Sequence, residues 1–203
     1  MQNLDILFIT ADNSKAIYQS LSNNYSAIEP PTWSLLLAQS CRSVGYNVAI
    51  LDANAEKITH QQILDRIRLI KPRLLCFVVY GQNVNSGTTS MDGATSLSKF
   101  LKKNNTSIPI TFLGSHVQAL PIETLKKEKS IDIVITNEGV YALRNLLKFD
   151  KFIESNLDQV KGIGFRKNGK PYLTLPESVV PQEKMDIDLP GYAWDLLPYK
   201  NKP

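Results

Sequence analysis

The stretch that decides the fold is Leu74–Tyr80, with the sequence LLCFVVY, which is the most apolar run in the chain. It is too short for a typical helix, and an unbroken apolar run of this length is typical of a strand that is buried on both of its faces. We therefore expect it to lie near the centre of a sheet that is covered on both sides.

Other short apolar runs on either side of this stretch predict further strands, and segments with helical spacing lie between them. Strands that alternate with helices predict a parallel sheet with right-handed crossovers, so the fold class is α/β with helices on both faces. The sequence also predicts that residues 81–87 form a loop. The expected strands are 4–10, 47–51, 74–80, 108–113 and 131–135, and the expected helices are 32–44, 59–70, 88–103, a short helix from Pro121, and 140–147.

The last part of the chain has a different character. Val160–Arg166 and Pro171–Leu175 flank a turn, which predicts a β-hairpin. Five of the eleven prolines lie from Pro176 onward, which favours an extended segment draped over the rest of the molecule. We therefore expect an α/β domain of residues 1–149, a hairpin appendage of residues 150–175 and an extended linker of residues 176–203.

Composition excludes several classes of function. The net charge is +4, but the basic residues do not form one stripe, so we do not expect nucleic-acid binding. The chain has only two cysteines, Cys41 and Cys76, which we expect in the core, so it cannot hold an iron-sulfur cluster alone. No apolar run is long enough to cross a bilayer, and Asp5 stands where a signal peptide carries positive charge, so we expect a cytoplasmic protein without a membrane segment.

The loops after the strands lack the common nucleotide and catalytic motifs. The loop after the first strand has no G-x-G-x-x-G, and the chain has neither a P-loop nor a G-x-S-x-G elbow. Tyr80-Gly81 stands where a phospho-acceptor receiver needs an aspartate. The strand-end loops instead carry glycine, amide and hydroxyl residues, which suit a large neutral ligand bearing amides, although such residues are also ordinary loop components.

Three titratable residues at strand ends have alternative interpretations. His116 either lines a pocket as a hydrogen-bonding group or is structural, and with only His60 besides it a metal site is not expected. Asp52 and Glu138 are expected to cap the helices that follow them rather than to move protons. We therefore assign neither a catalytic residue nor a metal ligand.

Ordered groups of residues resemble the motifs of one protein family. Pro30–Ala38 (PPTWSLLLA), followed by Gly45, Val48 and Asp52, resembles the opening "P-P-x-G-L-x-x-L-A … G-x-x-V … D", with Ser34 near the usual glycine. Leu113–His116 (LGSH) resembles "L-G-G-x-H", and Asp132–Gly139 (DIVITNEG) resembles "D-x-V-V-x-G-E-G". Val160–Gly169 (VKGIGFRKNG) resembles "V-x-G-I-x-Y-R-x-x-G", and Leu189–Leu196 resembles a linker into a catalytic barrel.

These motifs resemble those of the cobalamin-binding N-terminal domain of B12-dependent radical S-adenosylmethionine proteins. The resemblance implies a flavodoxin-like or Rossmann-like fold that holds cobalamin at the sheet edge. The D-x-H-x-x-G loop of other cobalamin domains is absent after the first strand, so cobalamin is expected base-off, without histidine from that loop. The expected cofactor-binding residues are Thr32, Tyr80, Gly81, Gln82, Asn83, Gly114, Ser115, His116, Asn137, Glu138 and Gly139.

The resemblance also implies that the chemistry lies elsewhere. The family's C-x-x-x-C-x-x-C motif is not in this chain, so the 4Fe-4S cluster and S-adenosylmethionine are expected only in a radical catalytic domain that is missing or on a separate chain. The expected function is a cobalamin-binding module for such an enzyme, for example a methyltransferase. The alternative is a cofactor-less domain that docks a partner through Trp33, Trp194 and the proline-rich tail, and a stand-alone nucleotide- or sugar-modifying enzyme comes third. Gly114→Val is expected to abolish cobalamin binding and leave the fold intact.

Overall fold

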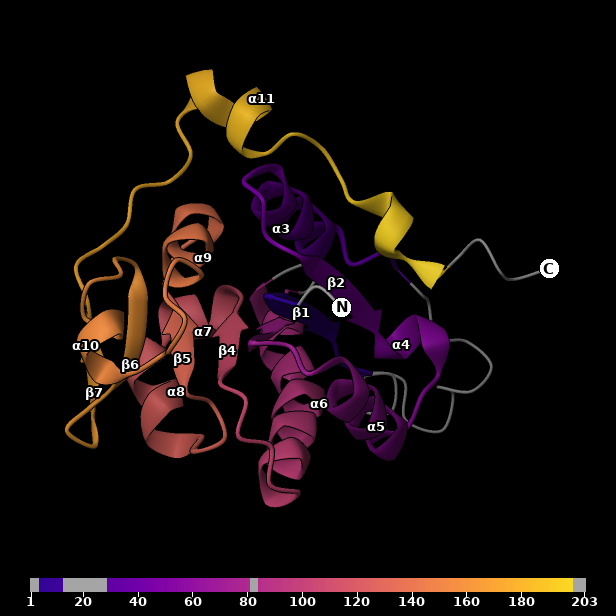
Figure 1. Cartoon of the computed structure of the whole chain (residues 1–203). Helices are drawn as coiled ribbons and strands as arrows, with labels where there is room; N and C mark the ends of the chain where they lie inside the picture. Colours follow the sequence, from indigo (N-terminus) through magenta and orange to yellow (C-terminus); the bar gives the residue numbers. More distant parts are fainter. Residues whose placement is uncertain (1–3, 13–28, 81–83, 199–203) are drawn as a thin grey trace.

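The computed structural model describes residues 4–12, 29–80 and 84–198, and its strands form one sheet in the order β2-β1-β3-β4-β5-β6-β7 (Figure 1). The strands β1 to β5 pair in parallel, and β6 pairs antiparallel with β5. The order β2-β1-β3-β4-β5 is that of doubly wound flavodoxin-like sheets, so the expected α/β fold is confirmed. The bounds are β1 Ile6–Thr10, β2 Val48–Asp52, β3 Leu74–Val78, β4 Ile110–Leu113, β5 Ile133–Ile135, β6 Ile163–Lys167 and β7 Lys170–Leu173.

The predicted hairpin forms, but it extends the sheet instead of standing apart as an appendage. Ile133 and Ile135 of β5 are in register with Phe165 and Ile163 of β6, so the sheet has seven strands rather than five. The physical reason is that the outer edge of β5 would otherwise leave its backbone groups unpaired. Gly164 makes the pairing possible, because a side chain there would press on Val134 and Leu173.

Helices cover both faces of the sheet (Figure 1). Ile6 and Phe8 of β1 pack with the cluster that contains α3 and α9, whereas Leu7 and Ile9 pack with α5, α6 and α8. Both faces are therefore buried, which explains why the strands are apolar without alternation. The principal helices are α3 Thr32–Ser43, α5 His60–Ile70, α6 Val84–Lys103, α8 Pro121–Lys127 and α9 Val140–Leu146.

The helix boundaries differ from expectation near two strand ends. Helix α6 begins at Val84 rather than at Thr88. Residues 84–87, which the sequence predicts to belong to a loop, are therefore helical, and residues 81–83 lie outside the described residues. An unexpected short helix, α7 (Ser115–Ala119), follows β4 directly. The short helices α4 (Ala53–Glu56) and α10 (Glu154–Leu157) also lack a periodic pattern long enough to predict. No helix in the described ranges is long and apolar enough to cross a membrane.

The segment after β7 crosses the outer side of α9 and α3 (Figure 1). It is not wholly extended, because it contains the 3-10 turns η2 (Gln182–Lys184) and η3 (Trp194–Leu196) and the short helix α11 (Met185–Asp188). Ala193 and Leu197 are buried in the same core cluster as α3, and the Ala193 amide donates to the Leu35 carbonyl at 3.3 Å. The segment is therefore packed on the α/β core.

A buried ion pair holds this segment to α9. The Arg144 guanidinium contacts the Asp188 carboxylate at 2.5 Å, and both side chains are largely buried. The Tyr141 hydroxyl donates to the other Asp188 oxygen at 2.6 Å. This hydrogen bond, together with Arg144, lowers the pKa of Asp188, and it raises the pKa of Tyr141 to about 12. The pair thus fixes the point where α11 ends.

We predict that Asp188→Ala lowers the free energy of unfolding by about 3–5 kcal/mol, because it leaves the Arg144 guanidinium buried without its carboxylate. Asp186→Ala is the matched control, since Asp186 is an exposed aspartate of the same short helix. Because the pKa of Asp188 is lowered in the folded state, its contribution is present above the unfolded pKa of about 4 and is lost as the pH falls further. Urea denaturation at pH 7 and at pH 3 measures both effects, and equal stability of the two variants at pH 7 contradicts the prediction.

Candidate functional site

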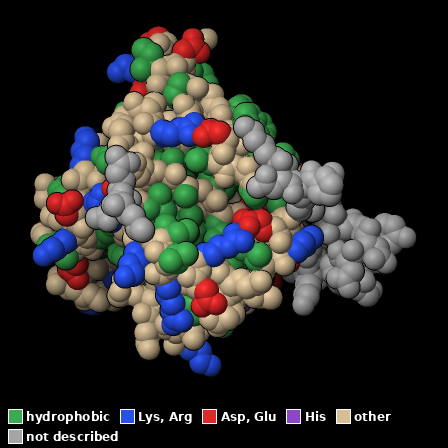
Figure 2. Space-filling view, turned by 45° about the vertical axis from the view of Figure 1, so that its right-hand side comes forward, with side chains coloured by type: hydrophobic (Ala, Val, Ile, Leu, Met, Phe, Trp, Pro, Cys, Tyr) green, Lys and Arg blue, Asp and Glu red, His purple; other side chains and the backbone are tan. Residues whose placement is uncertain are grey.

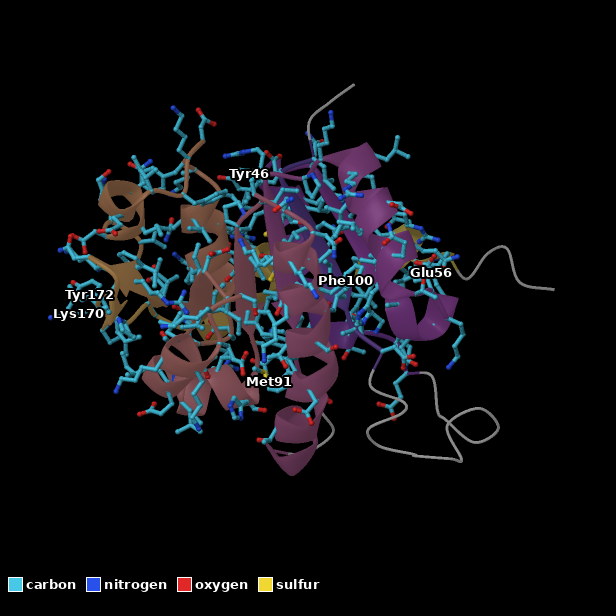
Figure 3. The ribbon with its side chains drawn as sticks, turned by 90° about the horizontal axis from the view of Figure 1, so that it is seen from below. Tyr46, Glu56, Met91, Phe100, Lys170 and Tyr172 are labelled. Atoms are coloured by element: carbon cyan, nitrogen blue, oxygen red, sulfur yellow. The ribbon has the colours of Figure 1, made fainter. Side chains whose placement is uncertain are left out.

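The carboxyl ends of β1, β3, β4 and β5 lie at one edge of the sheet, which we call the carboxyl edge. In Figure 3 this edge faces downward, on the side of Met91 near the start of α6, and Tyr46, which precedes β2, marks the opposite edge. Ligands of open α/β sheets bind at the carboxyl edge, near the point where the strand order reverses. In this sheet the order reverses between β1 and β3.

Gly114 brings the loops after β3 and β4 into close contact. Its φ of +150° belongs to a backbone region that is essentially restricted to glycine, and a Cβ there would overlap the carbonyl oxygen of Val79. The Val79 amide also donates to the Leu113 carbonyl at 2.7 Å. The backbones of the two loops are therefore in direct contact, and only glycine fits at residue 114.

The loop after β5 forms a tight turn before α9. The Asn137 side chain accepts a hydrogen bond from the Gly139 amide at 3.0 Å. Gly139 has a φ of +92°, and a Cβ there would overlap the Leu113 side chain. Asn137 thus stabilises the turn by its own side chain, although glycine is usual at this position of the motif that the loop resembles.

Aromatic and amide side chains connect the strand-end loops with α3. The Trp33 indole donates to the Glu138 carbonyl at 3.0 Å, and its ring meets the Tyr80 ring edge-on at 5.7 Å. The Gln118 amide nitrogen of α7 donates to the Tyr80 hydroxyl at 2.6 Å and to the Asn137 carbonyl at 2.7 Å. Burial raises the pKa of Tyr80, and the hydrogen bond from Gln118 acts in the opposite direction.

Neither Gln118 nor Trp33 was among the expected cofactor-site residues. Gln118 lies on a helix that the sequence does not predict, and its partners are 38 and 19 residues away in the chain. Trp33 fits the helical spacing of α3, and the only other role expected for it is to dock a partner in the alternative function. The only available signal was its place in the first turn of a helix that starts at the carboxyl edge.

The two histidines lie in different environments. His116 is half-buried in α7, and its Nδ1 lies 3.3 Å from the Thr88 hydroxyl of α6. His60 begins α5 and contacts the Phe100 ring at 5.5 Å, and burial lowers its pKa. No group of three potential metal-ligating side chains occurs in the part of the chain that the structure describes.

The two strand-end carboxylates have different partners. Asp52 accepts a hydrogen bond from the Ala55 amide at 3.0 Å and caps α4, as expected. Glu138 does not cap α9, contrary to expectation, because its carboxylate accepts from the Val180 amide of the tail at 2.9 Å. The Asn137 side chain also donates to the Glu177 carbonyl at 3.3 Å. The loop after β5 therefore contacts the site on one side and the tail on the other.

Several buried hydroxyls at the carboxyl edge lack a partner. The side-chain oxygens of Thr10, Ser34 and Ser115 are buried and make no hydrogen bond to any described residue. Thr10 ends β1, Ser34 lies in the first turn of α3, and Ser115 begins α7. Buried polar atoms in proteins almost always have a partner. In the described part of the chain Ser40, Thr111 and Thr124 also have buried hydroxyls without one, so the feature is not confined to this edge.

The structure places the expected site residues together where it describes them. Thr32 is exposed at the start of α3, and the others follow β3, β4 and β5 at the carboxyl edge. Gly81, Gln82 and Asn83 lie outside the described residues. The role of all these residues in cofactor binding stays a prediction, and the described ones are Thr32, Tyr80, Gly114, Ser115, His116, Asn137, Glu138 and Gly139.

We predict that Gly114→Ala destabilises the fold, because the added methyl group overlaps the Val79 carbonyl as well as straining the backbone. The expectation that Gly114→Val leaves the fold intact is therefore wrong. Gly45→Ala is the matched control, since Gly45 also has a positive φ of +96° but open space around its Cβ position. Thermal unfolding should show a cost of roughly 1–2 kcal/mol for Gly45→Ala and a clearly larger one for Gly114→Ala. Equal costs would show that the contact is unimportant.

Two curated proteins are similar to most of this chain. An uncharacterised methyltransferase of Pyrococcus horikoshii is 26% identical over 199 residues, which are 98% of this chain and 40% of that protein. The anaerobic magnesium-protoporphyrin IX monomethyl ester cyclase of Synechocystis sp. is 26% identical over 172 residues, which are 84% of this chain and 32% of that protein. This chain therefore spans less than half the length of either relative.

Solved structures share the fold at low sequence identity. The cobalamin-dependent S-adenosylmethionine radical enzyme OxsB, with aqua-cobalamin and S-adenosylmethionine bound, matches with a TM-score of 0.69 and 16% identity, over 96% of this chain and 25% of that one. The radical S-adenosylmethionine methyltransferase TsrM of Kitasatospora setae, with cobalamin and a 4Fe-4S cluster bound, matches with a TM-score of 0.58 and 13% identity, over 90% of this chain and 30% of that one.

The family model of the B12-binding domain matches residues 20–147. The matched range includes the strands β2 to β5 and the loops that follow them. Since the model covers more than half of the chain, this chain belongs to the family of B12-binding domains, whose cofactor is cobalamin.

Proposed function

We propose that this chain is a cobalamin-binding module that serves a radical S-adenosylmethionine enzyme, such as a methyltransferase. The observation that carries the proposal is the carboxyl edge, where Gln118 links the loops after β3, β4 and β5 and where the hydroxyls of Thr10, Ser34 and Ser115 have no partner among the described residues. When bound, cobalamin would supply the cobalt centre for a methylation that the catalytic part performs.

The residues at this edge fit the chemistry of a corrinoid. Cobalamin is large and carries neutral amide groups, which can bind hydroxyls, amides and free backbone groups. Glycines at residues 114 and 139 let the strand-end loops pack closely on one another, because a Cβ at either position would overlap Val79 or Leu113. The proposed contacts are Thr32, Tyr80, Gly81, Gln82, Asn83, Gly114, Ser115, His116, Asn137, Glu138 and Gly139.

The catalytic cluster would have to come from another part of the protein or from another chain. Cys41 and Cys76 are both buried, and burial raises the pKa of Cys41 to about 12 and that of Cys76 well above its usual value. Iron binds the thiolate form, so neither cysteine suits a 4Fe-4S cluster. We propose that the tail, residues 176–203, leads toward the catalytic domain and that the assembly works in the cytoplasm.

The docking alternative receives less support from the structure. Trp33 is engaged inside the molecule by Glu138 and Tyr80, so it is not free to anchor a partner. Trp194 is 50% exposed and contacts the Tyr192 ring at 5.5 Å. Charged side chains of both signs surround a group of hydrophobic side chains on the face that Figure 2 brings forward, and no single-sign stripe is seen there.

We predict that the purified protein retains hydroxocobalamin after desalting, as seen in its absorption spectrum. Retention at micromolar protein requires about 8 kcal/mol of binding free energy. Ser115→Ala should weaken binding about 2- to 10-fold, because it removes one hydrogen-bonding group from the proposed site. Ser43→Ala, an exposed serine at the far end of α3, is the control. The absence of retained corrinoid in the wild-type protein would contradict the proposal.

We also predict that bound cobalamin is base-off and has no histidine ligand from this chain. The segment after β1 contains no histidine, and His116 lies beside Thr88. The electron paramagnetic resonance spectrum of the cobalt(II) form should then show no nitrogen splitting, and His116→Ala should leave it unchanged. Nitrogen splitting that disappears in His116→Ala would identify His116 as a ligand and overturn this prediction.

A further inference from the structure

One amide side chain joins the loops after three strands. Gln118 lies on α7, which follows β4, and its Nε2 donates to the hydroxyl of Tyr80, which follows β3, and to the carbonyl of Asn137, which follows β5. The two distances are 2.6 and 2.7 Å. A primary amide nitrogen has two hydrogens, so Gln118 uses its full donor capacity at these atoms.

The contacts of Gln118 belong to a closed ring of interactions. Tyr80 meets the Trp33 ring at 5.7 Å, and the Trp33 indole donates to the Glu138 carbonyl at 3.0 Å. Glu138 follows Asn137 directly, so the ring returns to Gln118. In such a network the loss of one member loosens the others, because each side chain restricts the position of the next.

We propose that Gln118 is the positioning residue of the cofactor site, because it sets the spacing of the strand-end loops and aims the Tyr80 hydroxyl at the ligand. This inference rests on the proposed function. The Tyr80 oxygen accepts from Gln118, so its own hydrogen is left for an acceptor such as an amide carbonyl of cobalamin. Gln118 itself acts through Tyr80 and Asn137 rather than by touching the ligand.

Residue 118 has to be a neutral side chain of glutamine's length that donates two hydrogen bonds. Leucine has a similar size but no donor, and glutamate at neutral pH could only accept, which would place a carboxylate against the Asn137 carbonyl. Gln118→Leu and Gln118→Glu are therefore the informative variants. The matched control is Gln159→Leu, since Gln159 is an exposed glutamine whose Nε2 donates to the Ser155 carbonyl at 2.9 Å.

The first measurement needs no cofactor. The hydrogen bond from Gln118 stabilises the Tyr80 phenolate, so its loss in Gln118→Leu should raise the pKa of Tyr80 further. Nuclear magnetic resonance of tyrosine labelled at Cζ follows this titration, with Tyr80→Phe to assign the signal. Gln159→Leu should leave the titration unchanged. If Gln118 only stabilised the fold, Gln118→Leu would leave the pKa of Tyr80 unchanged.

The second measurement is the dissociation constant of hydroxocobalamin. Gln118→Leu should raise it about tenfold, and Gln118→Glu should raise it more. In a Tyr80→Phe background the effect of Gln118→Leu should become smaller, because one of its two partners is already lost. Circular dichroism verifies that each variant is folded, and Gln118→Glu replaces Gln118→Leu in both measurements if the latter does not fold.

The two measurements separate the failure of this inference from that of the proposed function. An unchanged Tyr80 titration together with an unchanged dissociation constant in Gln118→Leu overturns the inference. If the wild-type protein binds no cobalamin, the proposed function is wrong, and the Tyr80 titration alone then decides whether Gln118 positions Tyr80.

Discussion

The site depends on one close backbone contact, between Gly114 and the carbonyl group of Val79. Because no side chain separates these segments, β4 can end against β3 and α7 can begin at once at Ser115. Gln118 then lies one turn into α7, where it reaches Tyr80 on one side and Asn137 on the other. A larger residue at position 114 would move α7 away and separate these three loops.

The loop after β5 extends this arrangement to the C-terminal segment. Its backbone carbonyls accept from Gln118 and Trp33 at the site, while the Glu138 carboxylate accepts from the Val180 amide. Single hydrogen bonds of this kind contribute only about 1 kcal/mol each, so the tail is held mainly by its buried residues and by the Arg144–Asp188 pair. The loop after β5 nevertheless contacts both the proposed cofactor site and the tail, which we expect to lead toward the catalytic domain.

Local sequence patterns predict the strands and the sheet but not the contacts between loops. The apolar run LLCFVVY indicates a central strand, and Thr59 indicates the start of α5, where a capping box forms. Periodicity cannot reveal that β6 pairs with β5, that Glu138 binds the tail, or that Gln118 bridges Tyr80 and Asn137, because these contacts join residues far apart in the chain. The resemblance to cobalamin-binding domains identified the strand-end turns, but the side chains that connect them depend on packing in this particular chain.

Cobalamin is proposed to bind at the carboxyl edge of this sheet. The most direct measurement is a crystal structure of the protein with bound hydroxocobalamin. We expect the corrinoid to lie near the backbone at Gly114, with hydrogen bonds to the hydroxyls of Tyr80 and Ser115. A corrinoid bound at the opposite edge, near Tyr46, or on the tail would contradict it.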